Sequence, residues 1–496
     1  MRFLSLVPVA FLASFALAQR PLTLTILHSN DLHSHVEPTA IRGKTYGGFA
    51  RISTIIKQTR AKEKNVILLN AGDVFQGTLY FNIYEGLAES VLLSKMGYQA
   101  SCLGNHEFDK GVPNLVEYCK RVNFPIVACN IDMTKEPELA KVVKPYTILT
   151  VDNQKIGIVG LITDTTGNIS LGVGSVTFQS HLAPAQKAVD ELTSQGVNKI
   201  IVLSHIGYGE DQQLAAKLHN VDLIVGGHSH TPLGTPDIPG WRPSGGSYPT
   251  YVKDADGKSV PIVQAWEWGK VFGDIKVEFD AKGNLTKVID AKPIVIDESI
   301  PEDPEIAKLV DAFRKPVTAM GSAVLGTSSQ DYTDHIQVGY FVADSYLQAT
   351  SKLGANFALM NPGGVRSNLE AGKITFNAAN SICPFRNTLV LADLTGAEVV
   401  KLLNDSHGSL IPSKGTSFKR GDGGVQAVMI NGQPIDLTKT YKVVVNNFMA
   451  GGGDNLDTLK ACTKKLDTGL NDIDAFVDFI KANSPLSIGN EVRIGR

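Results

Sequence analysis

Residues 104–109, Gly-Asn-His-Glu-Phe-Asp, place three side chains that can do chemistry within a few positions. Asn105 offers a neutral oxygen ligand, His106 can carry a proton near neutral pH, and Asp109 has a carboxylate that can orient the histidine. The stretch follows an apolar run, 98–103, that is typical of a buried strand. An ordinary strand-to-helix turn with Asp109 as the helix cap has the same composition. The interpretation therefore depends on what the other strands carry at their ends.

Strands and helices alternate along the first half of the chain. Apolar runs predict strands at 22–27, 66–69, 98–103, 126–129, 156–162, 200–203, 223–225 and 262–265, and helical stretches are expected at 48–62, 83–96, 112–122 and 182–195. This order predicts an α/β fold with right-handed crossovers and a sheet covered by helices. In such folds, functional side chains collect at the carboxyl ends of the strands.

Five of these strand ends carry residues that can ligate a metal. The seven candidate ligands are Asp31, His33, Asp73, Asn105, His205, His228 and His230. A single histidine at a strand end is most often structural, but carboxylates and imidazoles clustered in this way are costly to bury without a cation. Imidazole, carboxylate and amide oxygen together suit zinc, manganese or iron, and the absence of cysteine argues against a structural zinc site.

Seven ligands exceed the needs of one tetrahedral ion. Two divalent ions that share a carboxylate fit better, at the spacing of about 3.5–4 Å that is typical of two-metal phosphatases. Asp73 stands alone on its strand end and is the expected bridge.

The composition indicates a folded protein of two domains. The chain has 496 residues, of which 43% are hydrophobic and 19% charged. Its formal net charge is -2, so there is no basic excess for nucleic acid or an anionic membrane, and any bound phosphate must be held locally.

The N-terminus has the pattern of a secretory signal. A positive start, an apolar run over 3–17 and small residues at 16–18 predict a signal peptide at 1–18; the alternative is an N-terminal anchor. The C-terminal residues are polar and lack the hydrophobic tail of a lipid-anchor signal. We therefore expect a secreted protein without a membrane anchor, extracellular or, in a bacterium, periplasmic. Sequons at Asn168, Asn284 and Asn404 predict a glycoprotein if the source is eukaryotic.

The five cysteines cannot all pair with one another, and their spacing predicts no particular disulfide. Cys102 falls in a predicted buried strand, where a free thiol is the simplest interpretation.

The second half of the chain differs in character. Residues 268–296 read as antiparallel strands that close the first domain, and 301–320 as a helix with an acidic, proline-containing start. The loops at 361–366, 383–387 and 446–454 place glycines beside Asn, Arg, Phe and Asp. Such loops supply what a nucleoside pocket needs, namely aromatic faces for the base and an arginine for phosphate. Glycine-rich turns are most often only turns, so the loops alone do not establish a pocket.

The series Asp-x-His, Gly-Asp, Gly-Asn-His-Glu, His and Gly-His-x-His resembles the calcineurin-like metallophosphoesterase superfamily. With the second half, nearly the whole mature chain resembles the 5′-nucleotidase family. The resemblance implies an α/β/β/α metallophosphoesterase sandwich at 19–300, a linker helix at 301–320 and an α/β substrate-binding domain at 321–496.

The resemblance also implies roles for individual residues. One ion would be held by Asp31, His33, Asp73 and His230, and the other by Asp73, Asn105, His205 and His228. The catalytic dyad would be His106 and Asp109. The substrate would be bound by Asn361, Gly364, Arg366, the stacking pair Phe385 and Phe448, and the ribose-binding Asp454.

One departure concerns the second domain. The family usually carries an arginine shortly before a helix start in this domain, and residues 330–341 contain none. Arg386 and Arg420 are the candidates to compensate. His28 and His35, which flank the first motif, are expected to be structural or to support the ligands.

These observations predict a secreted phosphohydrolase that releases phosphate from AMP-like nucleoside 5′-monophosphates. Two divalent ions, zinc or alternatively manganese or iron, would lower the pKa of a bound water to give the attacking hydroxide. Domain closure about the linker helix is expected. The alternatives on the same centre are a UDP-sugar or nucleoside di- or triphosphate hydrolase and a 2′,3′-cyclic-nucleotide phosphodiesterase. A non-catalytic secreted nucleotide-binding protein is an alternative of another class.

Overall fold

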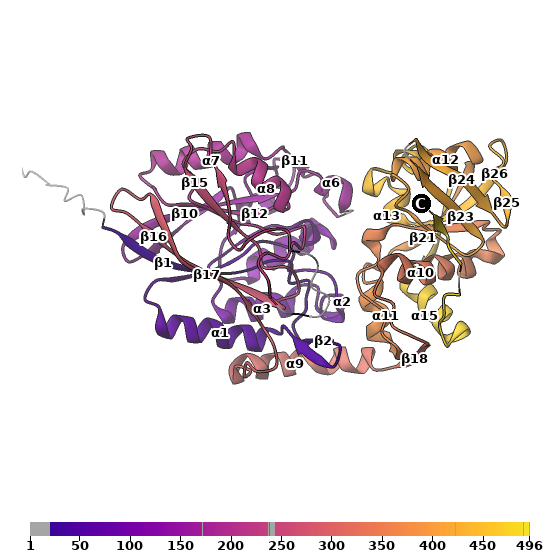
Figure 1. Ribbon diagram of the computed structural model, residues 1–496, viewed down its shortest axis with the longest axis horizontal. Coiled ribbons are helices and arrows are strands. Elements are labelled where there is room, and N and C mark those ends of the chain that lie inside the picture. The colour runs from indigo at the N-terminus through magenta and orange to yellow at the C-terminus, as the bar shows by residue number, and fades with distance from the viewer. Residues whose placement is uncertain are drawn as a thin grey trace, which may run out of the picture.

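Two α/β parts are joined by helix α9 (Pro304–Gly321) in the computed structural model (Figure 1). The structure describes residues 20–495 except 171, 237, 239–243, 422 and 490. The signal peptide predicted at 1–18 lies outside the described residues. Within the described ranges, we find no helix with both the length and the apolar character needed to cross a membrane.

The first part contains two large sheets. The seven-stranded sheet has the order β17-β16-β1-β4-β5-β6-β8 and the six-stranded sheet the order β14-β15-β13-β12-β10-β9. The strands of the first are β1 (Leu22–Ser29), β4 (Val66–Asn70), β5 (Ala100–Cys102), β6 (Ile126–Val127), β8 (Val143–Lys144), β16 (Val271–Phe279) and β17 (Leu285–Val295). Those of the second are β9 (Tyr146–Val151), β10 (Gln154–Ile162), β12 (Ile200–His205), β13 (Leu223–Val225), β14 (Thr250–Lys253) and β15 (Ser259–Val263).

Buried aliphatic side chains of β1 and β4 form one core with those of β10 and β12, so the two sheets pack face to face. Gly160 of β10 makes this close approach feasible, because a Cβ there would collide with the backbone of Val127 in β6. Helices α1 (Phe49–Lys62), α3 (Leu87–Met96) and α4 (Val112–Arg121) share a second core with the outer face of the first sheet. Helices α7 (Leu182–Ser194) and α8 (Tyr208–Ala215) cover the second sheet. This layering confirms the α/β/β/α sandwich that the resemblance implies. The single sheet expected from the order of strands and helices was wrong, because two sheets pack on each other and helices cover only their outer faces.

Most predicted elements are present with shifted ends, but one helix was wrong. The stretch expected as a single helix at 83–96 is two helices, α2 (Leu79–Tyr84) and α3. The break falls at Glu85 and Gly86, whose φ angles of 49° and 90° are left-handed and cannot continue an α-helix.

The second part has a five-stranded sheet with the order β22-β19-β26-β21-β27 and a four-stranded sheet with the order β25-β24-β23-β28. The strands of the five-stranded sheet are β19 (Phe357–Met360), β21 (Thr388–Thr395), β22 (Ile411–Pro412), β26 (Thr440–Asn446) and β27 (Lys465–Asn471). The strands of the four-stranded sheet are β23 (Thr416–Gly421), β24 (Gly424–Ile430), β25 (Gln433–Pro434) and β28 (Ile494–Gly495). Helices α10 (His335–Thr350) and α15 (Asp472–Asn483) share one core of this part, and α12 (Gly396–Asp405) contributes to a second.

All five cysteines are free, including the buried Cys102. Burial raises the pKa of the Cys129 thiol to about 12, so this thiol is not a reactive thiolate at neutral pH.

Candidate active site

The candidate ligands lie just beyond the ends of strands from both sheets. Asp31 and His33 follow β1, Asp73 follows β4, and Asn105 follows β5. His205 ends β12, and His228 and His230 follow β13. Five of the seven have left-handed backbone, with φ between 45° and 74°: Asp31, His33, Asp73, His228 and His230. Non-glycine residues adopt this conformation rarely, and such strain is concentrated at functional sites.

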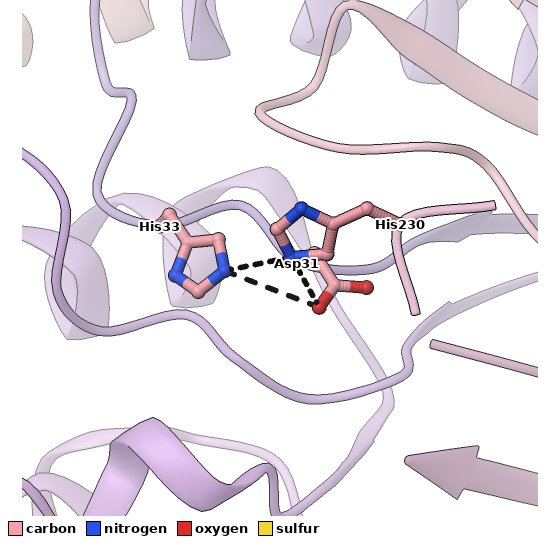
Figure 2. Close-up of side chains that lie close together, drawn as sticks. All are labelled: Asp31, His33 and His230. Carbon is pink, nitrogen blue, oxygen red and sulfur yellow. Dashed lines mark hydrogen bonds and ion pairs between the residues drawn. The ribbon is translucent and has the colours of Figure 1, made fainter. Parts of the chain in front are cut away.

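Three of these side chains point toward one another from two different loops (Figure 2). The His230 Nε2 atom lies 3.1 Å from Asp31 Oδ1 and 3.1 Å from His33 Nε2. The His33 Nε2 atom is 4.0 Å from Asp31 Oδ1. One carboxylate oxygen and two imidazole nitrogens therefore converge on a single point.

A second group adjoins the first through Asp73. Asp73 Oδ2 lies 3.0 Å from His205 Nε2 and 3.8 Å from His33 Nε2, so it faces both groups. Ligand atoms of Asp73, His205 and His228 all lie within 4.8 Å of one another. Glycine is required beside them, because a Cβ at Gly72 would collide with the His205 ring.

The hydrogen bonds of three histidines set their tautomers. The Nδ1 atoms of His33 and His205 lie 3.0 Å and 2.7 Å from the backbone carbonyls of Phe75 and Ala71, and that of His230 lies 2.6 Å from a carboxylate oxygen. Each Nδ1 therefore carries the proton and donates it. The Nε2 atom, which faces the carboxylates, is then the ring nitrogen available to a metal ion.

The charges and unpaired atoms of this cluster fit divalent cations. Asn105 Oδ1 is buried and accepts no hydrogen bond from the described residues. Asp31 Oδ1 and His205 Nε2 are also buried, and the contacts that they make are with His230 and Asp73 of the same cluster. Burial opposes a charge on His205, but the carboxylates of Asp73 and Asp31 outweigh it and raise the pKa of His205 to about 10. The buried carboxylates thus stabilise positive charge at this point, and divalent ions would supply it.

His106 and Asp109 form a pair at the edge of the cluster. His106 Nδ1 lies 2.7 Å from Asp109 Oδ2, which also accepts a hydrogen bond from Gln76 Nε2 at 3.1 Å. Ser170 Oγ donates to the Asn105 carbonyl at 2.7 Å. Burial lowers the pKa of His106, but Asp109 and Asp73 prevail and the net shift is upward.

A cavity of about 1320 Å³ lies between the two parts of the molecule. From the first part it is lined by the candidate ligands Asp73, Asn105, His228 and His230 and by the pair His106 and Asp109. From the second part, all six predicted substrate residues line it: Asn361, Gly364, Arg366, Phe385, Phe448 and Asp454. The Asn361 amide donates to Asp454 Oδ2 at 2.7 Å and thereby orients this carboxylate.

Two contacts connect the parts across this cavity. The Phe385 ring stacks on the His106 ring, with centroids 5.7 Å apart and planes inclined by 25°. Arg366 Nη2 lies 3.4 Å from His33 Nε2, and its guanidinium is 5.8 Å from the Phe385 centroid. Side chains of the second part therefore reach the cluster itself.

Comparisons with known proteins find relatives of both parts of the chain. Residues 24–232 match the calcineurin-like phosphoesterase family, and residues 318–461 match the 5′-nucleotidase C-terminal domain. The chain is 34% identical to a 5′-nucleotidase of Bos taurus, with 96% of this chain and 91% of that protein covered. It is 33% identical to a 5′-nucleotidase of Homo sapiens, with 92% and 88% covered.

The chain belongs to the 5′-nucleotidase family. The structure of a 5′-nucleotidase precursor from Thermus thermophilus is 39% identical, with a TM-score of 0.91 and coverage of 96% of this chain and 99% of that one. The Haemophilus influenzae NAD nucleotidase is 26% identical, with a TM-score of 0.63 and coverage of 96% and 99%. This family membership makes the protein a phosphoric monoester hydrolase of the metallophosphoesterase type, which implies divalent metal ions.

Glu107 received no role from the sequence, although it lies inside the Gly-Asn-His-Glu motif. Its carboxylate accepts hydrogen bonds from the backbone N–H groups of Asp73, Val74, Phe75 and Gly104, at 2.6–3.2 Å. One side chain thus fixes the loop after β4 to the loop after β5. Its place in the motif was the available signal.

Glu267 and Lys270 were also missed by sequence reasoning. Glu267 provides the carboxylate that accepts from His230 Nδ1, and Lys270 is paired with it at 2.7 Å. Burial would raise the pKa of Glu267, but Lys270 and the His230 hydrogen bond hold it well below its usual value. No motif marks these two residues in the sequence.

The two flanking histidines lie outside the ligand groups. His28 Nε2 is 2.7 Å from the Tyr248 hydroxyl, and His35 stacks on Trp268 with centroids 4.4 Å apart. Of the arginines considered as replacements for the missing one, Arg386 lines the cavity. Arg420 instead donates to the Gly408 carbonyl at 2.8 Å.

Proposed function

We propose that this protein is a secreted 5′-nucleotidase that hydrolyses AMP-like nucleoside 5′-monophosphates to a nucleoside and inorganic phosphate. The observation that carries the proposal is that one cavity is lined both by candidate metal ligands and by aromatic, arginine and aspartate side chains suited to a nucleotide. The apolar N-terminal segment of the sequence supports secretion.

The seven candidate ligands are proposed to hold two divalent ions, with Asp73 shared between them. Zinc suits the ligand set, and manganese or iron are the alternatives. Ions bound there would polarise the phosphoryl oxygens and lower the pKa of a coordinated water.

His106 is proposed to stabilise the phosphoryl group during transfer. Its Nδ1 is held by Asp109, so Nε2 is the atom left to donate to a phosphoryl oxygen in the cavity. The pKa of His106 is shifted upward, which favours the protonated, donating form.

The second part is proposed to hold the rest of the substrate. Arg366 reaches the cluster from across the cavity and binds the scissile phosphate. Phe385 and Phe448 provide aromatic faces for the base, and Asp454, oriented by Asn361, accepts from the ribose hydroxyls. Arg386 takes the place of the arginine that residues 330–341 lack.

The test is phosphate release by the purified full-length protein from AMP, ADP, UDP-glucose and a 2′,3′-cyclic nucleotide. Each substrate is assayed after chelation and again after zinc or manganese is restored. We expect metal-dependent release from AMP at the highest kcat/KM. Release only from the other substrates would overturn the substrate assignment, and stoichiometric AMP binding without release would favour a non-catalytic binding protein.

A further inference from the structure

The segment from Gln264 to Lys270 follows β15 and contacts the loop that carries Asp31. The Trp268 N–H donates to the Asp31 carbonyl at 2.7 Å. The side chain of Asn30 bonds twice to the segment, as a donor to the Trp266 carbonyl and as an acceptor from the Ala265 N–H, both at 2.7 Å. The backbone beside the first candidate ligand is therefore fixed to this segment.

The same segment also holds the loop that carries His230. The Gln264 amide donates to the Gly227 carbonyl at 3.1 Å and accepts from the Thr231 N–H. Both loops of the group Asp31, His33 and His230 are thus attached to one short stretch of chain.

A chain of charged contacts runs outward from His230. His230 Nδ1 lies 2.6 Å from Glu267 Oε2, and Glu267 Oε1 lies 2.7 Å from Lys270 Nζ. The side chains of Glu267 and Lys270 are only 8% and 3% exposed. A buried charge of either sign is costly unless paired, so the carboxylate and the ammonium depend on each other.

The Lys270 ammonium is held between two aromatic rings. Its Nζ lies 3.7 Å from the Trp266 ring centroid and 4.2 Å from that of Trp268. Both tryptophans have left-handed backbone, with φ of 55° and 61°, which is an outlier for a bulky side chain. Cation–π contacts are strongest for a desolvated ammonium, so the rings define where the charge sits.

We infer that Glu267 and Lys270 are positioning residues for the ion held by Asp31, His33 and His230. Binding of this ion then changes the environment of the Trp266 and Trp268 rings. This inference rests on the proposed metal centre. Glu267 fixes the His230 ring and strengthens its Nε2 as a donor to the ion. Lys270 holds the Glu267 carboxylate in place and balances the negative charge gathered around the ion.

The test measures metal binding directly by competition of Zn²⁺ or Mn²⁺ with a chelator in the full-length protein. Glu267→Gln keeps the shape and removes the charge, and we expect it to weaken one of the two ions about 10–100-fold. Lys270→Met should do the same. In the double variant the loss should be smaller than the sum of the single losses, because no buried charge is left unpaired.

The matched control is Lys258→Met. Lys258 Nζ lies 2.6 Å from the buried Asp222 in the same domain, so its loss also breaks an ion pair with a buried carboxylate. A purely structural role of Lys270 predicts equal effects of both lysine variants on stability and none on metal affinity. Wild-type affinity for both ions in Glu267→Gln and Lys270→Met would overturn the inference, whereas a wild-type protein that binds neither ion would overturn the metal centre itself.

Tryptophan fluorescence gives a second readout. The chain has three tryptophans, so in a Trp241→Phe background the emission comes only from Trp266 and Trp268. Metal titration should change this emission with the midpoint found by chelator competition, and Lys270→Met should shift the midpoint. Emission that does not respond to a bound ion would contradict the coupling.

Discussion

The two sides of the interdomain cavity are built differently. On the metal side, Asp31, Asp73 and His205 are fully buried, and backbone groups or carboxylates fix the histidine rings through Nδ1. On the opposite side, Arg386 lies on a loop and is exposed. If the proposed roles hold, this difference leaves the reacting centre fixed before substrate arrives, while Arg386 would contribute to recognition from an exposed loop.

Asp73, the proposed bridging carboxylate, gives the largest expected effect. Asp73→Asn removes the negative charge that both ligand groups share, and we expect the rate of phosphate release from AMP to fall by more than about 100-fold. Loss of a residue that only supports a metal ligand costs about 10–100-fold, and loss of the shared ligand itself should cost more. The control is Asp222→Asn, which alters a buried carboxylate bound to Lys258 and should leave turnover intact. Near-normal activity of Asp73→Asn at saturating metal would contradict the proposed two-metal centre.

The next largest effect is expected at His106, whose ring stacks on Phe385 of the second part. His106→Asn removes the proposed donor to the phosphoryl group, so kcat should fall about 10²–10³-fold. Metal content, measured by elemental analysis, should stay at the wild-type value. A loss of metal in this variant would mean that His106 supports the ligands rather than the substrate.

A variant of the recognition side should separate binding of the base from the chemistry. Phe448→Ala removes one aromatic face of the cavity and should raise the KM for AMP, because stacking on a base contributes about 1–3 kcal/mol. Hydrolysis of a small phosphate ester that has no base should be unchanged. Equal losses of kcat/KM on both substrates would contradict the proposal that Phe448 binds the base and takes no part in the reaction at phosphorus.

The smallest expected effect tests the replacement of the missing arginine. Arg386→Ala should lower kcat/KM for AMP by up to about fivefold, because an exposed charged contact contributes about 1 kcal/mol or less. Arg420→Ala, which breaks a hydrogen bond outside the cavity lining, serves as the matched control. If Arg420→Ala lowered kcat/KM as much as Arg386→Ala, the assignment of Arg386 as the replacement arginine would be wrong.

The sequence by itself determined the α/β order and the set of candidate ligands. Asp31 and Asp73 follow apolar strands of the first sheet and His205 ends one of the second, and parallel strands bring their carboxyl ends to one edge of each sheet. The packing of the two sheets, which brings these edges together, is not given by this rule. These inferences need only local periodicity and a general rule of topology. The helix break at Glu85 and Gly86 was missed although the sequence marks it, because glycine readily adopts the left-handed φ of 90° found at Gly86.

Only the tertiary structure decided which residues support the ligands and whether Arg386 or Arg420 lines the cavity. Glu107 is recognisable by motif, but its hydrogen bonds to Asp73 and Val74 span more than 30 residues. Glu267 meets His230 across 37 positions of chain, and Arg366 meets His33 across 333. Such contacts depend on how loops from different strands fold over one another, and sequence spacing carries no information about that.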